Sequence, residues 1–225
     1  MEDFLTPLWL SCKLAFITTF SLFIIAVPIV YGLSMKKFFA QSIVKVIIAL
    51  PLILPPSVLG FYLLIALQPN SYLGSFWNMV FDARLAFSFE GILIGSIIFS
   101  LPFMVNPILS AIENLPHHLS EASYSLGKTK WQTFHKVLLP NIRPSIISAA
   151  ILTFAHTIGE FGVILMIGGN IPGETRVASI AIFHELESMN YDMANQYAAV
   201  LLVFSFVVLL LVQFIHKNPT RPIIC

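Results

Sequence analysis

Long apolar runs separated by short polar segments cover most of the chain. A helix needs about 20 mostly apolar residues to cross roughly 30 Å of hydrocarbon. Five runs meet that length, at about residues 14–33, 43–67, 85–112, 144–167 and 197–215. The stretch before Lys13 and residues 177–183 are candidates for a sixth segment, short or re-entrant, because neither is long enough to span alone. The pattern predicts an all-α integral membrane protein with about five transmembrane helices.

The longest polar segment between these runs occupies residues 113–141. Its helix signals are, in chain order, Asn114 and Pro116 as a start, Gly127 as a left-handed stop, Thr129 with Gln132 as a capping box, and Pro140 as an end. A structured loop on one side of a membrane is typical of a contact with a soluble partner. We therefore expect a helix-turn-helix loop in which short helices flank a glycine turn.

The composition is that of a single membrane domain. Hydrophobic residues make up 57% of the 225 residues and charged residues 10%, whereas soluble domains carry about 25% charged residues. No linker or repeat is visible, so we expect one integral membrane domain over residues 1–225. A net charge of +1 without a basic tract excludes nucleic acid as a partner. Cys12 and Cys225 have no neighbours at the spacing of a metal or redox motif.

The distribution of basic residues predicts the orientation in the membrane. With the 113–141 loop in the cytoplasm, nine of the twelve basic residues lie inside: Lys36, Lys37, Lys45, Lys128, Lys130, Lys136, Arg143, Lys217 and Arg221. The outer side then holds Lys13, Arg84 and Arg176, together with most of the acids. The positive-inside rule therefore predicts an external N-terminus and a cytoplasmic C-terminus. The N-terminus lacks the basic region of a signal peptide, so the first run is expected to be retained.

Prolines interrupt the second run at Pro51, Pro55 and Pro56. Each proline removes a backbone donor, and unpaired backbone at membrane depth is tolerated only against protein or a wet cavity. Two interpretations stay open: a kinked helix that lines a pore, and an ordinary kink packed against its neighbours. Pro102 and Pro107 predict kinks in the third run in the same way.

The fourth run contains ionisable groups at membrane depth, His156 and Glu160, close to Gly159 and Gly162. Burying such a group costs about 3 kcal/mol on insertion scales, so it usually faces the bundle interior or a water path. Four residues apart on a helix, the His156 and Glu160 side chains would share one face. They form either a structural pair, with the glycines allowing close helix contact, or a gate, or a proton relay.

Residues 168–176 form a turn-rich loop on the predicted outer side. The loop includes Pro172, Gly173, Glu174 and Arg176, which are turn-forming and charged residue types. It is either a solvated connection or a docking surface. Residues 177–187 after it could form a surface helix that ends in acids.

The polar loop carries a recognisable motif. Glu121, Ala122 and Ser123 are followed after three residues by Gly127, and after nine more by Val137-Leu-Leu139-Pro140. This pattern resembles the cytoplasmic signature of ABC-importer permeases, Glu-Ala-Ala, three residues, Gly, nine residues, Ile, any residue, Leu-Pro. The departures are Ser123 for Ala and Val137 for Ile. The resemblance implies that residues 113–141, the coupling segment, contact a cytoplasmic ABC ATPase subunit.

Further segments resemble those of molybdate permeases over essentially the whole chain. They are residues 50–56, Gly159-Glu-Phe-Gly162, and Asn170-Ile-Pro-Gly-Glu-Thr-Arg176. The resemblance implies a bacterial inner-membrane permease for a tetrahedral oxyanion, molybdate in the first place, with tungstate and sulfate as alternatives. It also implies an external oxyanion-binding protein as a partner.

The chain is predicted to work as part of a complex and not to be an enzyme by itself. It has no Gly-x-x-x-x-Gly-Lys-Ser/Thr loop, so ATP would be bound by the partner subunit, and we expect no cofactor or metal in this chain. Five spans leave little interior for an aqueous path, which favours a homodimer. A proton-coupled transporter using His156 and Glu160 is the first rival, although such proteins usually carry repeats. An intramembrane enzyme is the second, and the His-x-x-x-Glu pair is a thin site for it.

Overall fold

The computed structural model describes residues 2–35 and 39–217. Several residues used in the predictions above lie outside this part of the chain, namely Lys36, Lys37, Arg221 and Cys225, as does the side chain of Lys217.

The described residues form helices joined by short loops, without a strand. The helices are α1 (Glu2–Met35), α2 (Gln41–Ile53), α3 (Pro56–Leu67), α4 (Tyr72–Phe81), α5 (Phe89–Glu113), α6 (His117–Ser125), α7 (Lys130–Thr133), the π-helical turn η1 (Phe134–Leu138), α8 (Leu139–Asn141), α9 (Arg143–Gly159), α10 (Gly162–Gly168), α11 (Ala178–Glu187) and α12 (Tyr191–Lys217). The predicted all-α class is confirmed.

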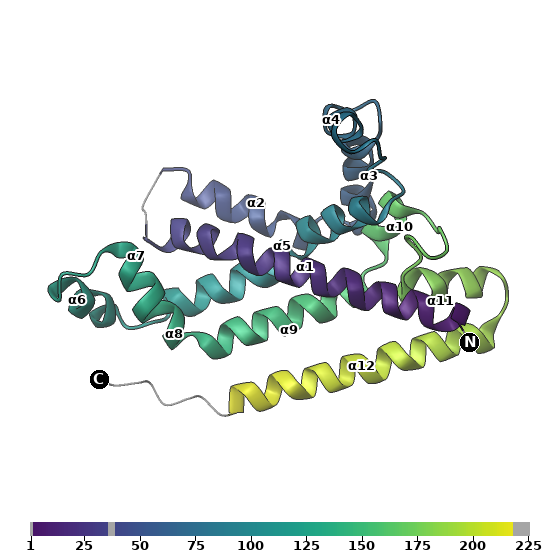
Figure 1. The fold of residues 1–225 in the computed structure, drawn as a ribbon. Coiled ribbons are helices and arrows are strands. Elements are labelled where there is room, and N and C mark those ends of the chain that lie inside the picture. The colour runs from purple at the N-terminus through teal and green to yellow at the C-terminus, as the bar shows by residue number, and fades with distance from the viewer. Residues whose placement is uncertain (1, 36–38, 218–225) are drawn as a thin grey trace.

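Four helices, α1, α5, α9 and α12, run along one common direction and form the body of the molecule (Figure 1). Helices α6 to α8 lie at one end of this bundle, whereas α11 and the beginnings of α1 and α12 lie at the other. Between α1, α5 and α9 the core is closely filled, with Leu22, Val30, Met104, Ile108 and Ala149 almost completely buried. The bundle therefore has two distinct ends joined by a packed apolar middle.

The structure has three to five candidate spans, and its upper limit agrees with the five that were predicted. Three of the described helices, α1, α5 and α12, are long and apolar enough to cross a membrane, and the number rises to five if each of two bent pairs counts as one span. The stretch before Lys13 is the beginning of α1 and not a separate segment. Residues 177–183 belong to α11, a ten-residue helix whose first turn, including Ala178, is buried. The predicted surface helix is thus partly internal.

The second run is bent far more sharply than the kink that its prolines predicted. Helices α2 and α3 meet at an angle of 112°. The break falls at Leu54 and Pro55, whose ψ angles of 136° and 132° are extended. Each of them precedes a proline, and the ring of a following proline disfavours the helical conformation. Pro51, by contrast, lies inside α2 without ending it.

The fourth run is also divided, which contradicts the prediction of a continuous helix over residues 144–167. Helix α9 ends at Gly159, Glu160 is extended with φ −70° and ψ 132°, and α10 starts at Gly162. The bent pair that includes α9 instead joins it, at 75°, to residues Lys130–Asn141 of the polar segment. Because the helix ends before Glu160, His156 and Glu160 do not share a face of one helix.

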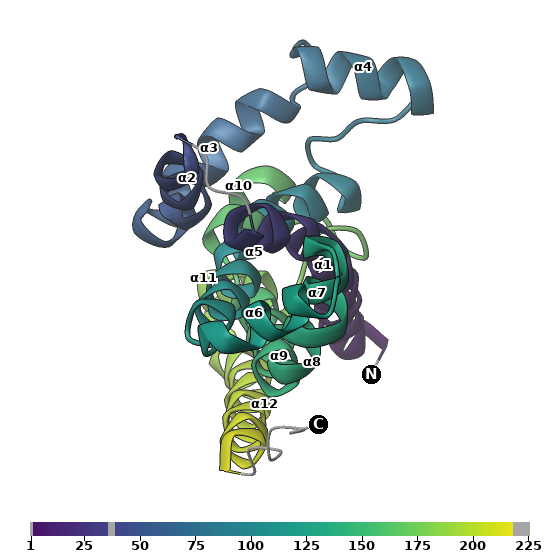
Figure 2. The ribbon, with the colours of Figure 1, turned by 90° about the vertical axis from the view of Figure 1, so that its left-hand side faces the viewer.

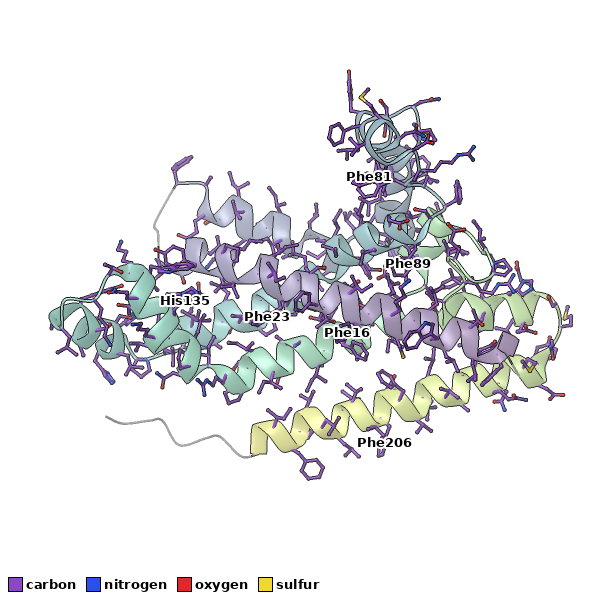
Figure 3. All side chains as sticks on the ribbon, viewed as in Figure 1. Phe16, Phe23, Phe81, Phe89, His135 and Phe206 are labelled. Carbon is purple, nitrogen blue, oxygen red and sulfur yellow. The ribbon has the colours of Figure 1, made fainter. Side chains whose placement is uncertain are left out.

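Large apolar side chains cover the outer surface of the bundle. On α12, Phe206 is 62% exposed and points away from the other helices (Figure 3). Helix α4 projects from the body and runs across the bundle direction (Figure 2), with exposed Tyr72, Phe76 and Met79. A surface of this kind suits a lipid environment or another membrane-embedded chain.

Candidate functional site

The turn of the coupling segment is built by local hydrogen bonds around Gly127. Gly127 has φ +75°, as predicted for a left-handed helix stop. Its N–H donates to the Tyr124 carbonyl at 2.9 Å, and the Lys128 N–H donates to the Ser123 carbonyl at 3.2 Å. This pair of bonds is a Schellman motif, which satisfies the last carbonyls of α6. A Cβ at Gly127 would have nothing within 4 Å, so the backbone conformation and not a lack of space requires glycine.

The coupling segment has two helical arms, α6 (His117–Ser125) before the glycine turn and Lys130–Asn141 after it. The second arm begins with the predicted capping box. The Gln132 N–H donates to the Thr129 hydroxyl at 3.3 Å, and the Thr129 N–H donates to Gln132 Oε1 at 3.0 Å. The predicted start of the first arm is only partly correct. Pro116 is the N-cap of α6, but Asn114 is the C-cap of α5, where its N–H bonds to the Ser110 carbonyl.

Pro140 was predicted to end the second arm, but the helix continues past it. The chain stays helical to Asn141 because a π-helical turn precedes the proline, with the Leu139 N–H bonded to the Phe134 carbonyl five residues back. A proline cannot donate to the carbonyl four residues before it. The Asn141 side chain supplies a nearby donor and bonds to the Val137 carbonyl at 2.7 Å. The direction of the chain changes afterwards, at Ile142.

The two arms of the segment are tied together by a buried hydrogen bond that the sequence did not reveal. The hydroxyls of Ser123 and Thr133 lie 2.9 Å apart, and the two residues are 3% and 0% exposed. Ser123 is the position where the motif departs from Glu-Ala-Ala. The departure from alanine was itself the available signal, because a hydroxyl in a buried position needs a partner.

An aromatic cluster fixes the segment against the end of α1. The Tyr31 ring contacts Trp131 and Phe134 edge-on, with centroid distances of 4.9 and 5.2 Å. Nearby, Lys130 Nζ donates to the Met35 carbonyl at 3.4 Å. The sequence pattern did not predict this contact of Tyr31. The contacts make the second arm and α1 one packed unit.

The face of the segment that points away from the bundle is exposed. Glu121 and Ala122 are both exposed, Leu126 is 77% exposed and Trp131 50% exposed. Helix α6 forms the tip of this end of the molecule (Figure 1). Leu139 and Pro140, the last residues of the motif, are half-buried near the base of the segment. This end of the molecule therefore carries a stiff, partly apolar exposed surface.

Within the bundle, the predicted proline and glycine features contact each other. A Cβ built at Gly162 would lie 2.7 Å from Pro56 Cβ, and one at Gly60 would lie 2.7 Å from Met166 Cβ. Side chains at these glycines would therefore collide with the facing helix, and α3 and α10 approach closely only without them. Gly159 differs, because it is exposed and a Cβ there would meet nothing within 4 Å.

His156 and Glu160 do not form the predicted pair. The His156 ring contacts the rings of Phe103 and Phe99, with centroids 3.9 and 5.1 Å away, and its Nε2 has no hydrogen-bond partner among the described residues. Glu160 is 4% exposed. Its backbone carbonyl accepts a hydrogen bond from the Ser179 hydroxyl of α11 at 2.5 Å.

The loop over residues 168–176 is organised by Thr175 at the other end of the bundle. The buried Thr175 hydroxyl donates to the Gly168 carbonyl at 2.8 Å and accepts from the Ile171 N–H at 3.0 Å. Arg176 Nε donates to Asn170 Oδ1 at 2.6 Å. Pro172, Gly173 and Glu174 of this loop are exposed, and Gly173 has φ +77°.

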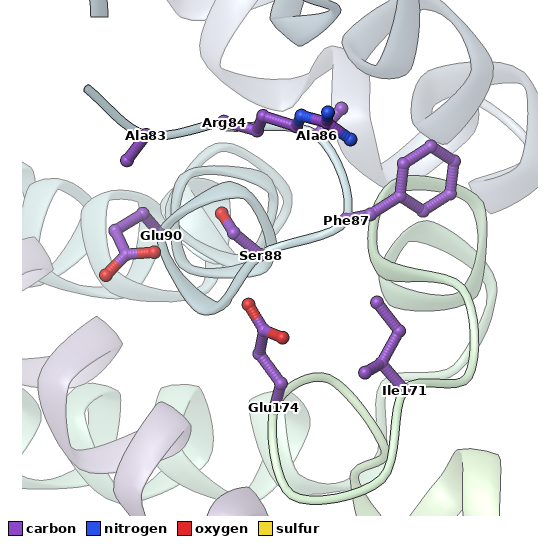
Figure 4. Close-up of a pocket in the computed structure, with 8 residues that line it drawn as sticks. All are labelled: Ala83, Arg84, Ala86, Phe87, Ser88, Glu90, Ile171 and Glu174. Carbon is purple, nitrogen blue, oxygen red and sulfur yellow. The ribbon is translucent and has the colours of Figure 1, made fainter. Parts of the chain in front are cut away.

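A shallow hollow lies between this loop and the loop before α5. Its volume is about 390 Å³, and it is lined by Ala83, Arg84, Ala86, Phe87, Ser88, Glu90, Ile171 and Glu174 (Figure 4). The Phe87 N–H bonds to the Ile167 carbonyl at 2.9 Å, which holds the loop before α5 to the last turn of α10. Helix α1 joins the same end, since Ser11 Oγ accepts a hydrogen bond from the Ala178 N–H at 2.8 Å.

Comparison with known proteins shows matches over almost the entire chain. The chain is 41% identical over 208 residues, 92% of each chain, to the molybdenum transport system permease protein ModB of Azotobacter vinelandii. It is 31% identical over 201 residues to the sulfate transport system permease protein CysT of Escherichia coli (strain K12), a match that covers 87% of this chain and 72% of the relative.

The fold is shared with chains of solved ABC transporters. A chain of a bacterial alginate ABC transporter superposes with a TM-score of 0.78 at 19% identity, covering 98% of this chain and 81% of that one. A chain of the MetNI methionine ABC transporter gives 0.73 at 19% identity, with 98% of each chain covered. Residues 15–221 match the family model described as binding-protein-dependent transport system inner membrane component. The chain belongs to that family of inner membrane components of binding-protein-dependent transport systems.

Proposed function

We propose that the chain is the permease subunit of an ABC importer that carries molybdate across the bacterial inner membrane. The observation that carries this proposal is the 41% identity to a molybdenum permease over 92% of both chains. Tungstate is chemically close to molybdate and is expected to share the path. Sulfate is the second candidate, because a sulfate permease is 31% identical over 87% of this chain.

The coupling segment is proposed to bind the ATPase subunit, with Glu121, Ala122, Ser123, Gly127, Leu139 and Pro140 as its motif residues. Its exposed edge at Leu126 and Trp131 supports this assignment, because it offers apolar area at the tip of the molecule. The Schellman turn and the Ser123–Thr133 bond keep that edge in one shape. A preformed surface loses little conformational entropy on binding.

The opposite end is proposed to face the external oxyanion-binding protein. It carries the hollow lined by Arg84, Glu90 and Glu174, together with the exposed turn of Pro172 and Gly173. This arrangement follows from an external N-terminus and a cytoplasmic C-terminus, the orientation that the basic residues favour.

Two copies of the chain are proposed to enclose the path. The interior of one bundle is filled by side chains such as Met104 and Ile108, which are 0% and 1% exposed. The surface around the α2–α3 bend is open instead, with Pro55, Pro56 and Ser57 all exposed. A path bordered by the exposed prolines and by Gly159 would be closed by the same surface of a second copy.

Uptake by vesicles that contain this chain with its ATPase subunit tests the function. We expect ATP-dependent molybdate uptake in the presence of the binding protein, with competition by tungstate and none by phosphate. Sulfate competition at equal concentration would move the assignment to the sulfate permeases. Uptake that persists without ATP and collapses with the proton gradient would replace the proposal by the proton-coupled rival based on His156 and Glu160.

The orientation has a separate test in a cysteine-free background. An impermeant thiol reagent added outside is expected to label a cysteine at Asn70 or Asn190 but not at Lys130. All three positions are exposed, and α11, which precedes Asn190, lies at the end of the bundle opposite to α7, which begins at Lys130. Labelling of Lys130→Cys alone would reverse the orientation and remove the coupling segment from the cytoplasm.

A further inference from the structure

The carboxyl group of Glu160 is buried inside the bundle without a hydrogen-bond partner among the described residues. It lies in the break between α9 and α10 and is 4% exposed. Neither of its oxygens has a hydrogen-bond partner among the described residues. A polar group buried this completely without a partner is uncommon and requires an explanation.

Among the described residues, no salt bridge to a cation compensates a negative charge at this position. The ion pair that the described residues form joins Lys45 to Glu113, on α2 and at the end of α5. His156, one turn before Glu160, has its ring against Phe103 and leaves Nε2 without a partner. A buried carboxylate without a counter-charge is strongly unfavourable, and such groups become neutral instead.

A neutral carboxyl group has a suitable neighbour in Ser96 of α5. The Ser96 hydroxyl is the polar group beside the Glu160 side chain. Ser96 is 0% exposed, and its oxygen also lacks a partner among the described residues. A protonated carboxyl is a donor as well as an acceptor, so one hydrogen bond between the two side chains would give both groups a partner.

We propose that Glu160 is a proton-binding site whose carboxyl group stays protonated at neutral pH and donates a hydrogen bond to Ser96. The backbone of the same residue is held from the other side by Ser179 of α11. Glu160 therefore connects the helix break to α5 through its side chain and to α11 through its main chain.

The protonated state has a consequence for an anion path. An ionised carboxylate would repel a doubly charged oxyanion, whereas a carboxylic acid does not. Glu160 can thus lie in the transport domain of an oxyanion permease without opposing its substrate. The charge of this side chain is the same whichever anion the complex carries.

Infrared spectroscopy of the purified complex tests the proposal without a transport assay. At neutral pH the exposed carboxyl groups are ionised, since ordinary glutamates titrate near a pKa of about 4. We expect a carbonyl band of a protonated carboxyl group in the wild-type complex that disappears in Glu160→Gln. The matched control is Glu90→Gln, at an exposed position near the start of α5, which should leave this band unchanged.

A second variant keeps the proposal testable if Glu160→Gln does not assemble. Ser96→Ala removes the proposed acceptor and should shift the carbonyl band without reducing its area, because the acid loses its hydrogen bond but stays protonated. A wild-type spectrum without a band assigned to Glu160 overturns the proposal, and an unshifted band in Ser96→Ala overturns the assignment of Ser96 as the acceptor.

Discussion

The coupling segment and the helix breaks inside the bundle obtain their shapes in different ways. In the coupling segment, residues close in sequence determine the turn: Gly127, its carbonyl partners and the Thr129–Gln132 box lie within ten residues. The close approach of α3 and α10 instead depends on Pro56 and Gly162, about one hundred positions apart. The first region should therefore keep its shape when remote contacts change, whereas the second should not.

The largest effect is expected from Gly162→Val. Its Cβ would lie 2.7 Å from Pro56 Cβ, and neither the proline ring nor the backbone of the break can move away easily. Overpacking in a filled interior costs about 1 to 3 kcal/mol. We expect a lower midpoint of thermal unfolding in detergent and loss of uptake.

The matched control for this prediction is Gly159→Val, three residues earlier. A Cβ at Gly159 would have no contact within 4 Å in this chain. The isolated variant chain should therefore unfold at nearly the wild-type temperature. Equal destabilisation by both variants would show that glycine matters here for the backbone and not for the α3–α10 contact.

A smaller effect is expected from Gly127→Val in the coupling segment. A β-branched residue in the left-handed region costs about 1 to 2 kcal/mol, and the cost falls on the turn alone because no neighbour is displaced. The protein should still insert and unfold near the wild-type temperature, but bind the ATPase subunit more weakly and lose most uptake. Co-purification of the ATPase subunit measures the binding.

Gly127→Asn provides the graded comparison, because asparagine tolerates the left-handed conformation better than valine does. It should restore most of the ATPase binding. Normal assembly and uptake in Gly127→Val would contradict the assignment of this segment as the ATPase contact.

The smallest effect concerns the bond between the two arms of the segment. Removing one partner of the Ser123–Thr133 pair should cost about 1 kcal/mol, and removing both should cost less than the sum of the single changes. Ser123→Ala, Thr133→Val and the double variant form the cycle, measured by ATPase binding. Strictly additive losses would mean that the hydroxyls do not act together.

The features that the sequence predicted correctly are those that depend on neighbouring residues. The capping box and the Gly127 turn depend on side chains within a few residues, and both predictions are confirmed. The π-helical turn before Pro140 was missed because the sequence does not show how the freed carbonyls are satisfied. In this structure Asn141 bonds to the Val137 carbonyl, next to the freed one.

Predictions that needed tertiary information were less complete. His156 and Glu160 have helical spacing in the sequence, but α9 ends at Gly159 and His156 packs against Phe103 instead. The dipeptide Pro55-Pro56 indicated a kink, yet nothing local fixed an angle of 112°. The functional roles of the proline, glycine and outer-loop residues remain predictions, which the variants above address.

Helix α1 touches both ends of the molecule. Near its beginning Ser11 is bonded to the first residue of α11, and near its end Tyr31 and Met35 hold the second arm of the coupling segment. A 34-residue helix is about 50 Å long. Pivoting such a rod by 5° about one end moves its other end by about 4 Å, because the rise of 1.5 Å per residue sets the length of the lever. A rotation of α1 by a few degrees at the coupling segment is therefore a displacement of several ångströms at the opposite end of the molecule.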